Sequence, residues 1–312
     1  MYVPDELETF LQILSTGIDG RCLEKFIIFN GSGGNGKGVV DDIMLVMLGN
    51  YGMIANNSLL FENSSMGCNP EKANIHKKRY IVFREPPARL KFQNSIIKEI
   101  TGGGTFSARG LYDSNTTKDL NNTTICECND KPAFSDEITN ADVRRIIDIY
   151  FRASFTDNND LVDESNHVYK ANPEYKTPEF KHKYKYALFK ILTDQHKKFL
   201  DNNSILKIAP SINARTQNYL ENSVDIVTWF KDEYTYDETS NEYLKVGDLY
   251  NELVNSDFYK ELKKTERDKY TKLKFFEFVR TNMFFRKYYI DQHDSKKRLL
   301  KGWYKTNNEI DM

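Results

Sequence analysis

The 312-residue chain lacks the long apolar runs, the abundant Gly and Pro and the leader that mark membrane, fibrous or secreted proteins. Its longest apolar runs, such as residues 26–29 and 44–48, are far shorter than the roughly 20 residues that span a bilayer. Its 16 Gly and 8 Pro exclude a collagen-like chain. The acidic N-terminus has no basic segment followed by an apolar one. We therefore expect an intracellular protein without membrane contact.

Cysteine and net charge are also scarce. The four cysteines, Cys22, Cys68, Cys126 and Cys128, cannot form a disulfide framework in a chain of this length, and the last two do not have the Cys-x-x-Cys spacing. We expect reduced, mostly buried thiols. Because 44 Lys and Arg nearly balance 45 Asp and Glu, any affinity for nucleic acid must come from local basic surface.

The apolar residues that are present, 39% of the chain, are enough for two packed domains. Short apolar runs alternate with helical stretches over residues 25–160, which is typical of an open α/β sheet. Residues 156–180 are polar and indicate a long loop or linker. We predict a lead-in helix within residues 1–24, an α/β core over 25–160, a linker and connecting helix over 161–216, and a second domain over 217–312.

The sharpest motif is the glycine-rich segment at residues 31–38. It has the spacing Gly-x-x-x-x-Gly-Lys between an apolar strand and an apolar helix. In such a loop, backbone N–H groups and a helix N-terminus bind phosphate oxygens, and the lysine reaches the β and γ phosphates of a nucleotide. The predicted nucleotide-binding residues are Gly31, Ser32, Gly33, Gly34, Asn35, Gly36, Lys37 and Gly38.

Gly38 departs from the motif. The residue after the lysine is normally Ser or Thr, whose hydroxyl binds Mg²⁺. Since Mg²⁺ usually keeps several waters, a water can take that coordination position, so the loss weakens catalysis without excluding it. Gly38 is also the best sequence argument for a protein that binds nucleotide but turns it over poorly.

A second apolar run, residues 80–83, leads to Arg84 and Glu85 and then to two prolines. A carboxylate at the C-terminal end of such a strand lies beside the phosphate loop, where it holds Mg²⁺ through water or polarises the attacking water. We predict this role for Glu85. Taken in isolation, the residue would be interpreted as a surface glutamate at a strand end.

Further motifs follow in a fixed order. They are Thr-Gly-Gly at 101–103, Arg-Gly-Leu-Tyr at 109–112, Asn-x-Lys-Pro at 129–132 and Arg-Arg at 144–145. With the phosphate loop and the Glu-Pro strand end, this order resembles superfamily 3 helicases, in particular the poxvirus-type primase-helicases of large DNA viruses and phages. The resemblance covers roughly residues 22–155, and residues 215–305 resemble the C-terminal module of the same proteins. We find no counterpart of their primase domain.

The resemblance implies an AAA+-like P-loop NTPase core that forms a ring, usually hexameric, around DNA and hydrolyses ATP with Mg²⁺. It makes Glu85 the Walker B acid that also holds the metal, and Asn129 the residue that orients the attacking water. Without the resemblance, residues 129–132 would be interpreted as an ordinary turn. Arg144 and Arg145 match the position of the arginine finger that a neighbouring subunit supplies. The plainer interpretation is that both lie on the solvent-exposed face of a helix. The sequence does not say which of the two is the finger.

Two segments are predicted to contact DNA. The resemblance implies a hairpin within residues 107–122 that presents Arg109 and Lys118. Residues 260–305 hold fifteen Lys or Arg and six Asp or Glu, a local charge of +9, and suit a helical, winged-helix-like domain with a basic wing. Its paired aromatics, such as Phe284-Phe285, are expected in the core. The predicted DNA contacts there are Lys272, Lys274, Lys296, Lys297 and Arg298.

These observations predict an ATP-dependent DNA helicase of viral or phage-type replication. Expected cofactors are ATP and Mg²⁺, and expected partners are DNA, five further copies in a homo-hexamer, and a separate primase or other replication proteins. The site of action would be a virus factory in the host cytoplasm or the host nucleus. The alternative is a degenerate helicase-like protein that binds nucleotide and DNA without efficient hydrolysis. A small-molecule P-loop kinase lacks an acceptor or lid motif and leaves the basic module unexplained.

Overall fold

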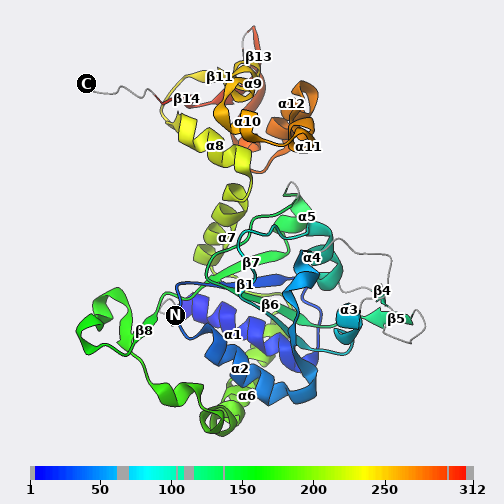
Figure 1. Cartoon of the computed structure of the whole chain (residues 1–312), viewed down its shortest axis with the longest axis vertical. Coiled ribbons are helices and arrows are strands. Elements are labelled where there is room, and N and C mark those ends of the chain that lie inside the picture. The colour runs from blue at the N-terminus through cyan, green and yellow to red at the C-terminus, as the bar shows by residue number, and fades with distance from the viewer. Residues whose placement is uncertain are drawn as a thin grey trace. The chain divides into compact units, whose positions relative to one another are not determined.

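The alternating apolar runs build a five-stranded parallel sheet in the computed structural model (Figure 1). The strand order is β2-β3-β6-β1-β7, so the strand before the phosphate loop, β1, lies between β6 and β7. All neighbours are parallel, and the C-terminal ends of the strands therefore share one edge of the sheet. The strands are β1 (Phe26–Asn30), β2 (Gly52–Ala55), β3 (Tyr80–Arg84), β6 (Thr123–Cys128) and β7 (Ile146–Tyr150).

The structure describes residues 4–61, 70–102, 105–108, 116–135, 138–293 and 295–306. The chain divides into a first unit, residues 1–136 and 141–219, and a second unit, residues 137–140 and 220–312. All of residues 161–216, the predicted linker and connecting helix, therefore belong to the first unit. Within the described part of the chain, no helix is long and apolar enough to cross a membrane.

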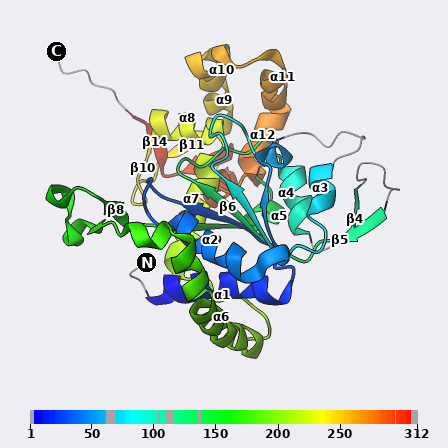
Figure 2. The same ribbon diagram turned by 60° about the horizontal axis from the view of Figure 1, so that its bottom comes forward.

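Three helices cover one face of the sheet: α1 (Pro4–Asp19), α2 (Lys37–Leu48) and α6 (Pro178–Asp201) (Figures 1 and 2). Because side chains alternate along a strand, Ile27 and Phe29 of β1 point to this face, where Phe29 packs against Phe10 of α1. Phe26 points the other way and contacts Phe92. Both faces are apolar, as expected for a covered parallel sheet.

Smaller elements complete the first unit. A two-stranded antiparallel hairpin is formed by β4 (Thr105–Ala108) and β5 (Thr116–Asp119), and a parallel pair by β8 (Ser154–Thr156) and β9 (Val168–Lys170). The remaining helices are α3 (Pro70–Asn74), α4 (Asn94–Thr101), α5 (Asn140–Val143) and α7 (Pro210–Asn222), of which α7 crosses into the second unit. Single 3₁₀ turns cover Gly49–Tyr51, Asn57–Leu60, Asn159–Leu161, Glu164–Asn166 and Pro173–Lys176.

The second unit has the order helix, strand, helices, hairpin that a winged-helix-like domain requires. Its three-stranded antiparallel sheet has the order β11-β13-β12, and a further pair joins β10 to β14. The strands are β10 (Tyr234–Tyr236), β11 (Tyr243–Lys245), β12 (Tyr289–His293), β13 (Lys296–Lys301) and β14 (Trp303–Lys305). The helices are α8 (Asp225–Glu233), α9 (Val246–Asn255), α10 (Asp257–Glu261), α11 (Lys264–Arg267) and α12 (Lys272–Thr281), with 3₁₀ turns at Asp268–Tyr270 and Phe285–Lys287.

Aromatic side chains form the core of the second unit, as the sequence predicts. Phe275, Phe284 and Phe285 are buried, and Phe230 lies 4.9 Å from Phe285 between ring centroids. Among the cysteines, Cys22, Cys126 and Cys128 are free thiols and the last two are buried, whereas Cys68 lies outside the described residues.

Candidate nucleotide-binding site

Residues 31–36 connect β1 to α2 as a tight glycine-rich loop. Gly31, Gly34 and Gly36 have φ angles of 146°, 72° and 86°, which side chains rarely adopt. A Cβ on Gly31 would lie 2.5 Å from the backbone oxygen of Phe151, so this position is closed to any other residue. The loop opens at Gly33, where a Cβ would meet nothing within 4 Å. This geometry is that of a phosphate cradle at a helix N-terminus.

Lys37 is the first residue of α2 and is only 4% exposed. Its Nζ donates to the backbone oxygen of Gly31 at 3.0 Å and to Oδ1 of Asn129 at 2.9 Å. Burial lowers the pKa of Lys37, while the charge of the nearby Glu85 opposes that shift. The structure thus brings the predicted phosphate lysine, strand-end acid and amide together. They meet because β1, β3 and β6 end at the same edge of the sheet.

Glu85 follows β3 directly and its side chain is exposed. Its φ angle is 46°, a left-handed conformation that costs a non-glycine residue about 1 kcal/mol or more. Its backbone N–H donates to the backbone oxygen of Glu127 at 2.8 Å, which fixes the turn. The turn directs the chain away from the sheet and leaves the Glu85 carboxylate at the strand end.

A pocket of about 760 Å³ opens beside the loop within the first unit. One end is polar and formed by residues 33–38 with Glu85, Glu127 and Asn129. The segment predicted as a loop contributes to the other wall, and the N–H of Phe155 donates to the oxygen of Gly34 at 2.9 Å. Sequence reasoning missed this wall because its residues are distant in the chain. They include Leu7, Phe10, Phe151, Arg152, Phe155, Asn172, Tyr175 and Lys176.

Glu127 is a second residue that the sequence reasoning missed. It lies near the end of β6, is 5% exposed, and has its carboxylate oxygens 3.9 and 4.0 Å from where a Cβ on Gly38 would be. Oε2 is 3.6 Å from Nε of Arg84, too far for a hydrogen bond. Oε1 is buried without a donor among the described residues. A single carboxylate between Cys126 and Cys128 in a buried strand was the available signal.

Asp41 of α2 lies beside Glu127 and is fully buried. Burial, followed by the neighbouring Glu127 carboxylate, raises the pKa of Asp41 well above its usual range, although the Tyr80 hydroxyl donates to it. Both effects favour the neutral form of the Asp41 carboxyl. Glu127, and not Asp41, lines the pocket.

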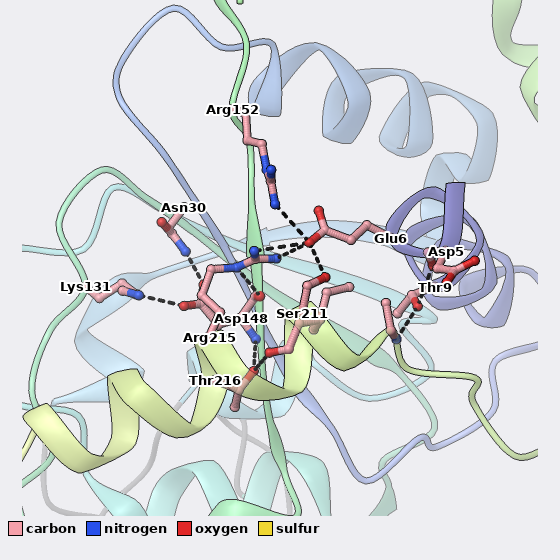
Figure 3. A network of polar contacts seen from close by, with 12 residues as sticks. Asp5, Glu6, Thr9, Asn30, Lys131, Asp148, Arg152, Ser211, Arg215 and Thr216 are labelled. Carbon is pink, nitrogen blue, oxygen red and sulfur yellow. Dashed lines mark hydrogen bonds and ion pairs between the residues drawn. The ribbon is translucent and has the colours of Figure 1, made fainter. Parts of the chain in front are cut away.

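A polar network supports the loop from the side of β7 (Figure 3). Asp148 of β7 is fully buried, accepts a hydrogen bond from Asn30 and pairs with Nζ of Lys131 at 2.6 Å. Asn30 directly precedes Gly31, and Lys131 follows Asn129 by two residues. Asp148 therefore links the start of the phosphate loop to the segment that carries Asn129.

The same network contains Glu6 of α1, which is 1% exposed (Figure 3). Its Oε1 accepts from the Ser211 hydroxyl at 2.5 Å, Arg215 at 3.1 Å and Arg152 at 3.2 Å. Burial alone would raise the pKa of Glu6, but the Ser211 hydrogen bond and the two arginine charges outweigh it and lower that pKa. Glu6 thereby holds Arg152 at the wall of the pocket.

The predicted arginine finger does not reach this pocket in its own chain. Arg144 and Arg145 precede β7, and the oxygen of Arg145 accepts from the N–H of Phe26 at the start of β1. They lie at the edge of the sheet opposite to the loop, in a turn rather than on the helix face considered above. The Arg144 side chain is 63% exposed, whereas that of Arg145 is 10% exposed and donates to the oxygen of Ala141.

The predicted DNA contacts are placed only in part. Arg109 lies outside the described residues, and Lys118 lies on β5 with its side chain outside them. Lys272 and Lys274 are exposed in the first turn of α12. Lys296, Lys297 and Arg298 are exposed on β13. The guanidinium of Arg298 lies 5.0 Å from the ring centroid of Phe276.

Comparison with known proteins identifies relatives of viral origin. Primase D5 of fowlpox virus (strain NVSL) is 27% identical over 211 residues, which are 65% of this chain and 26% of that protein. The putative helicase L207/L206 of Acanthamoeba polyphaga mimivirus is 35% identical over 108 residues, 34% of this chain and 11% of that protein. The chain thus spans about a quarter or less of these relatives. No protein-family model matches it.

Among solved structures, the apo C-terminal region of NrS-1 is 13% identical with a TM-score of 0.48, covering 94% of this chain and 71% of that one. The JCV helicase is 12% identical with a TM-score of 0.32, covering 70% of this chain and 56% of that one. The ordered motifs, the α/β P-loop core and the two viral relatives lead to one assignment. The chain is similar to viral primase and helicase proteins.

Proposed function

We propose that this chain is the ATP-driven motor of a DNA helicase that acts in viral genome replication. The observation that carries the proposal is the meeting of Lys37, Glu85 and Asn129 around one pocket at the C-terminal edge of the sheet. A P-loop lysine beside an acid and an amide is the set that phosphoryl transfer to water requires. The names of the two viral relatives support a helicase or primase role for this region.

ATP would bind with its phosphates against the N–H groups of residues 33–38. Lys37 would exchange its contacts with Gly31 and Asn129 for the β and γ phosphates, which leaves the Asn129 amide to orient a water. The apolar wall, which includes Phe10 and Tyr175, suits the purine ring. Each residue then acts from a position that its strand or helix already fixes.

The residues at the polar end fit a Mg²⁺ ion that arrives with the nucleotide. Glu85 is an exposed carboxylate at the pocket, and Glu127 presents a buried oxygen without a donor among the described residues. Carboxylate and phosphate oxygens are the ligands that Mg²⁺ prefers. When bound, the ion neutralises charge on the phosphates. Glu85 would hold it through water and polarise the attacking water.

We further propose Arg144 as the finger that completes a neighbouring subunit's site. Its exposed side chain at the far edge of the sheet has only a long surface pair with the exposed Glu24, which it could exchange for a contact with another copy, whereas Arg145 is buried against Ala141. This arrangement favours a ring, in which each copy presents one edge to the pocket of the next, and we propose a homo-hexamer. A primase or other replication proteins would act beside it.

The exposed cations of the second unit would bind the DNA backbone. Lys296, Lys297 and Arg298 lie together on β13 at the start of the wing, and Lys272 and Lys274 begin α12. Contacts from lysines to phosphates are independent of sequence and weaken with salt. Arg109 and Lys118 of the hairpin segment remain proposed contacts in the channel of the ring.

The second candidate is a nucleotide- and DNA-binding protein without efficient hydrolysis, which Gly38 favours. An unwinding assay on a forked duplex distinguishes the two. We expect strand separation with ATP and Mg²⁺, none with a non-hydrolysed ATP analogue, and none with Glu85→Gln. Binding of ATP and DNA without turnover or unwinding would refute the motor and leave the second candidate. Failure to bind nucleotide would refute both.

A further inference from the structure

The Glu127 carboxylate lies beside the place where a P-loop protein normally has a hydroxyl. Both of its carboxylate oxygens lie within 4.0 Å of the Cβ position of Gly38, in ordinary van der Waals contact. A serine at 38 would therefore direct its hydroxyl into the space beside this carboxylate. Gly38 of α2 lacks a side chain, and Glu127 of β6, the strand next to β1, has its carboxylate beside that position.

The neighbours of Glu127 account for it only in part, because Arg84 forms a long ion pair with it and Asp41 is a second carboxyl. A buried carboxylate is costly unless it is paired and hydrogen-bonded. The cation nearest to it, Arg84, already donates to Asp42 at 2.6 Å and lies 3.6 Å from Glu127. Oε1 of Glu127 has no donor in the described part of the chain, and the side chain lines the phosphate end of the pocket. A buried carboxylate oxygen without a hydrogen-bond donor among the described residues at that place is positioned to meet a ligand that arrives from the pocket.

We propose that Glu127 supplies the protein oxygen that binds the nucleotide's Mg²⁺ in place of the hydroxyl absent at Gly38. The inference rests on the proposed nucleotide binding. Mg²⁺ is commonly held by one or two carboxylates with phosphate oxygens and waters. In the described residues, no three His, Cys, Asp or Glu side chains form a metal site by themselves. Glu127 and Glu85 with the phosphates would complete one, so the metal binds with the nucleotide and not before it.

The test is the linkage between metal and nucleotide, measured by titrating a fluorescent non-hydrolysed ATP analogue into the full chain with Mg²⁺ or with EDTA. In the parent, Mg²⁺ tightens analogue binding. In Glu127→Gln, we expect the ratio of analogue affinity with Mg²⁺ to that with EDTA to fall about tenfold or more. The affinity for the analogue in EDTA should stay the same or improve, because the variant loses a negative charge. Glu127→Asp keeps the charge but withdraws the oxygen, and we expect an intermediate loss. Mn²⁺ affinity in the presence of the analogue, followed by electron paramagnetic resonance, should fall in parallel.

Two further variants show whether the position of the oxygen matters. Gly38→Ser combined with Glu127→Gln restores a ligand at the same place, so we expect the Mg²⁺ gain to return. Asp42→Asn is the matched control, because it removes a carboxylate from the same pocket wall that Arg84 and Lys181 already pair. We expect the Mg²⁺ gain to remain in this variant.

Three results would overturn the inference. The first is an unchanged Mg²⁺ gain in both Glu127 variants, and the second is a failure of Gly38→Ser to restore the gain in Glu127→Gln. The third is a loss of the Mg²⁺ gain in Asp42→Asn equal to that in Glu127→Gln, which would assign the effect to net charge. If Glu127→Gln does not fold, the Glu127→Asp titration decides alone. A parent that binds the analogue with no Mg²⁺ gain also contradicts the inference, whereas a parent that binds no analogue refutes the proposed function itself.

Discussion

Glu6→Gln should destabilise the first unit by about 3 kcal/mol. Oε1 of Glu6 accepts from Ser211, Arg152 and Arg215, and the residue is 1% exposed. Removing one partner of a buried ion pair costs roughly 3–5 kcal/mol because the remaining charge loses its compensation. The two arginine side chains are 33% and 21% exposed and keep some water, so the lower end applies. For a unit of this size, the loss corresponds to a melting temperature lower by about 6–12 °C.

The two tryptophans of the chain allow this effect to be localised. Trp229 and Trp303 both lie in the second unit, so tryptophan fluorescence reports on that unit and far-ultraviolet circular dichroism reports on both. Glu6→Gln should lower the urea concentration at the midpoint of the transition followed by circular dichroism. The midpoint followed by fluorescence should not change. The matched control is Glu8→Gln, whose partner Lys207 is exposed and whose loss should cost less than about 1 kcal/mol.

The difference between the parent and Glu6→Gln should also depend on pH. The pKa of Glu6 is lower in the folded than in the unfolded state, where a glutamate titrates near about 4.3. The carboxylate's contribution is therefore complete at pH 7 and is lost as the pH falls through the folded-state pKa. A difference below about 1 kcal/mol at pH 7, or one that does not narrow in acid, would refute the reasoning.

Three further predictions concern the proposed activity. Arg144→Ala should lower ATP turnover at least about 10³-fold with nucleotide binding unchanged, whereas Arg145→Ala should lower thermal stability because the Arg145 side chain is buried. Equal turnover in Arg144→Ala and the parent would exclude Arg144 as the finger. Tyr175→Ala should weaken ATP binding about fivefold in a fluorescence titration, through the loss of roughly 1 kcal/mol of ring contact, and unchanged affinity would place the base elsewhere. Replacing Lys296 and Lys297 together with Ala should reduce the slope of log K against log salt for single-stranded DNA by about 1.4, without a change in unfolding; an unchanged slope would remove the wing from the DNA site.

The strand, loop and helix of the candidate nucleotide site could be predicted because their signals are local. Gly31, Gly36 and Lys37 lie within one short segment, and its apolar flanks specify a strand and a helix. Glu85 and Asn129 required one further step, the rule that parallel strands end at a common edge. The structure places both beside the loop.

The remaining parts of the site depend on contacts between distant residues. Glu6 meets Arg215 across 209 positions of sequence, and no local pattern distinguishes it from the other acids of the first helix. Tyr175 lies in a polar segment whose position beside the pocket is set by β8 and β9. Glu127 gave a signal, one acid in a buried strand, but its meaning depends on the absent side chain of Gly38.

The most direct test of the central claim is steady-state ATP hydrolysis with Mg²⁺, with and without single-stranded DNA, for the parent and Lys37→Ala. The control is Lys190→Ala, an exposed lysine of α6 whose partner Asp194 is also exposed. We predict hydrolysis that DNA stimulates in the parent and the control and that Lys37→Ala abolishes. Hydrolysis that persists in Lys37→Ala, or a parent that hydrolyses no ATP with DNA present, would contradict the account.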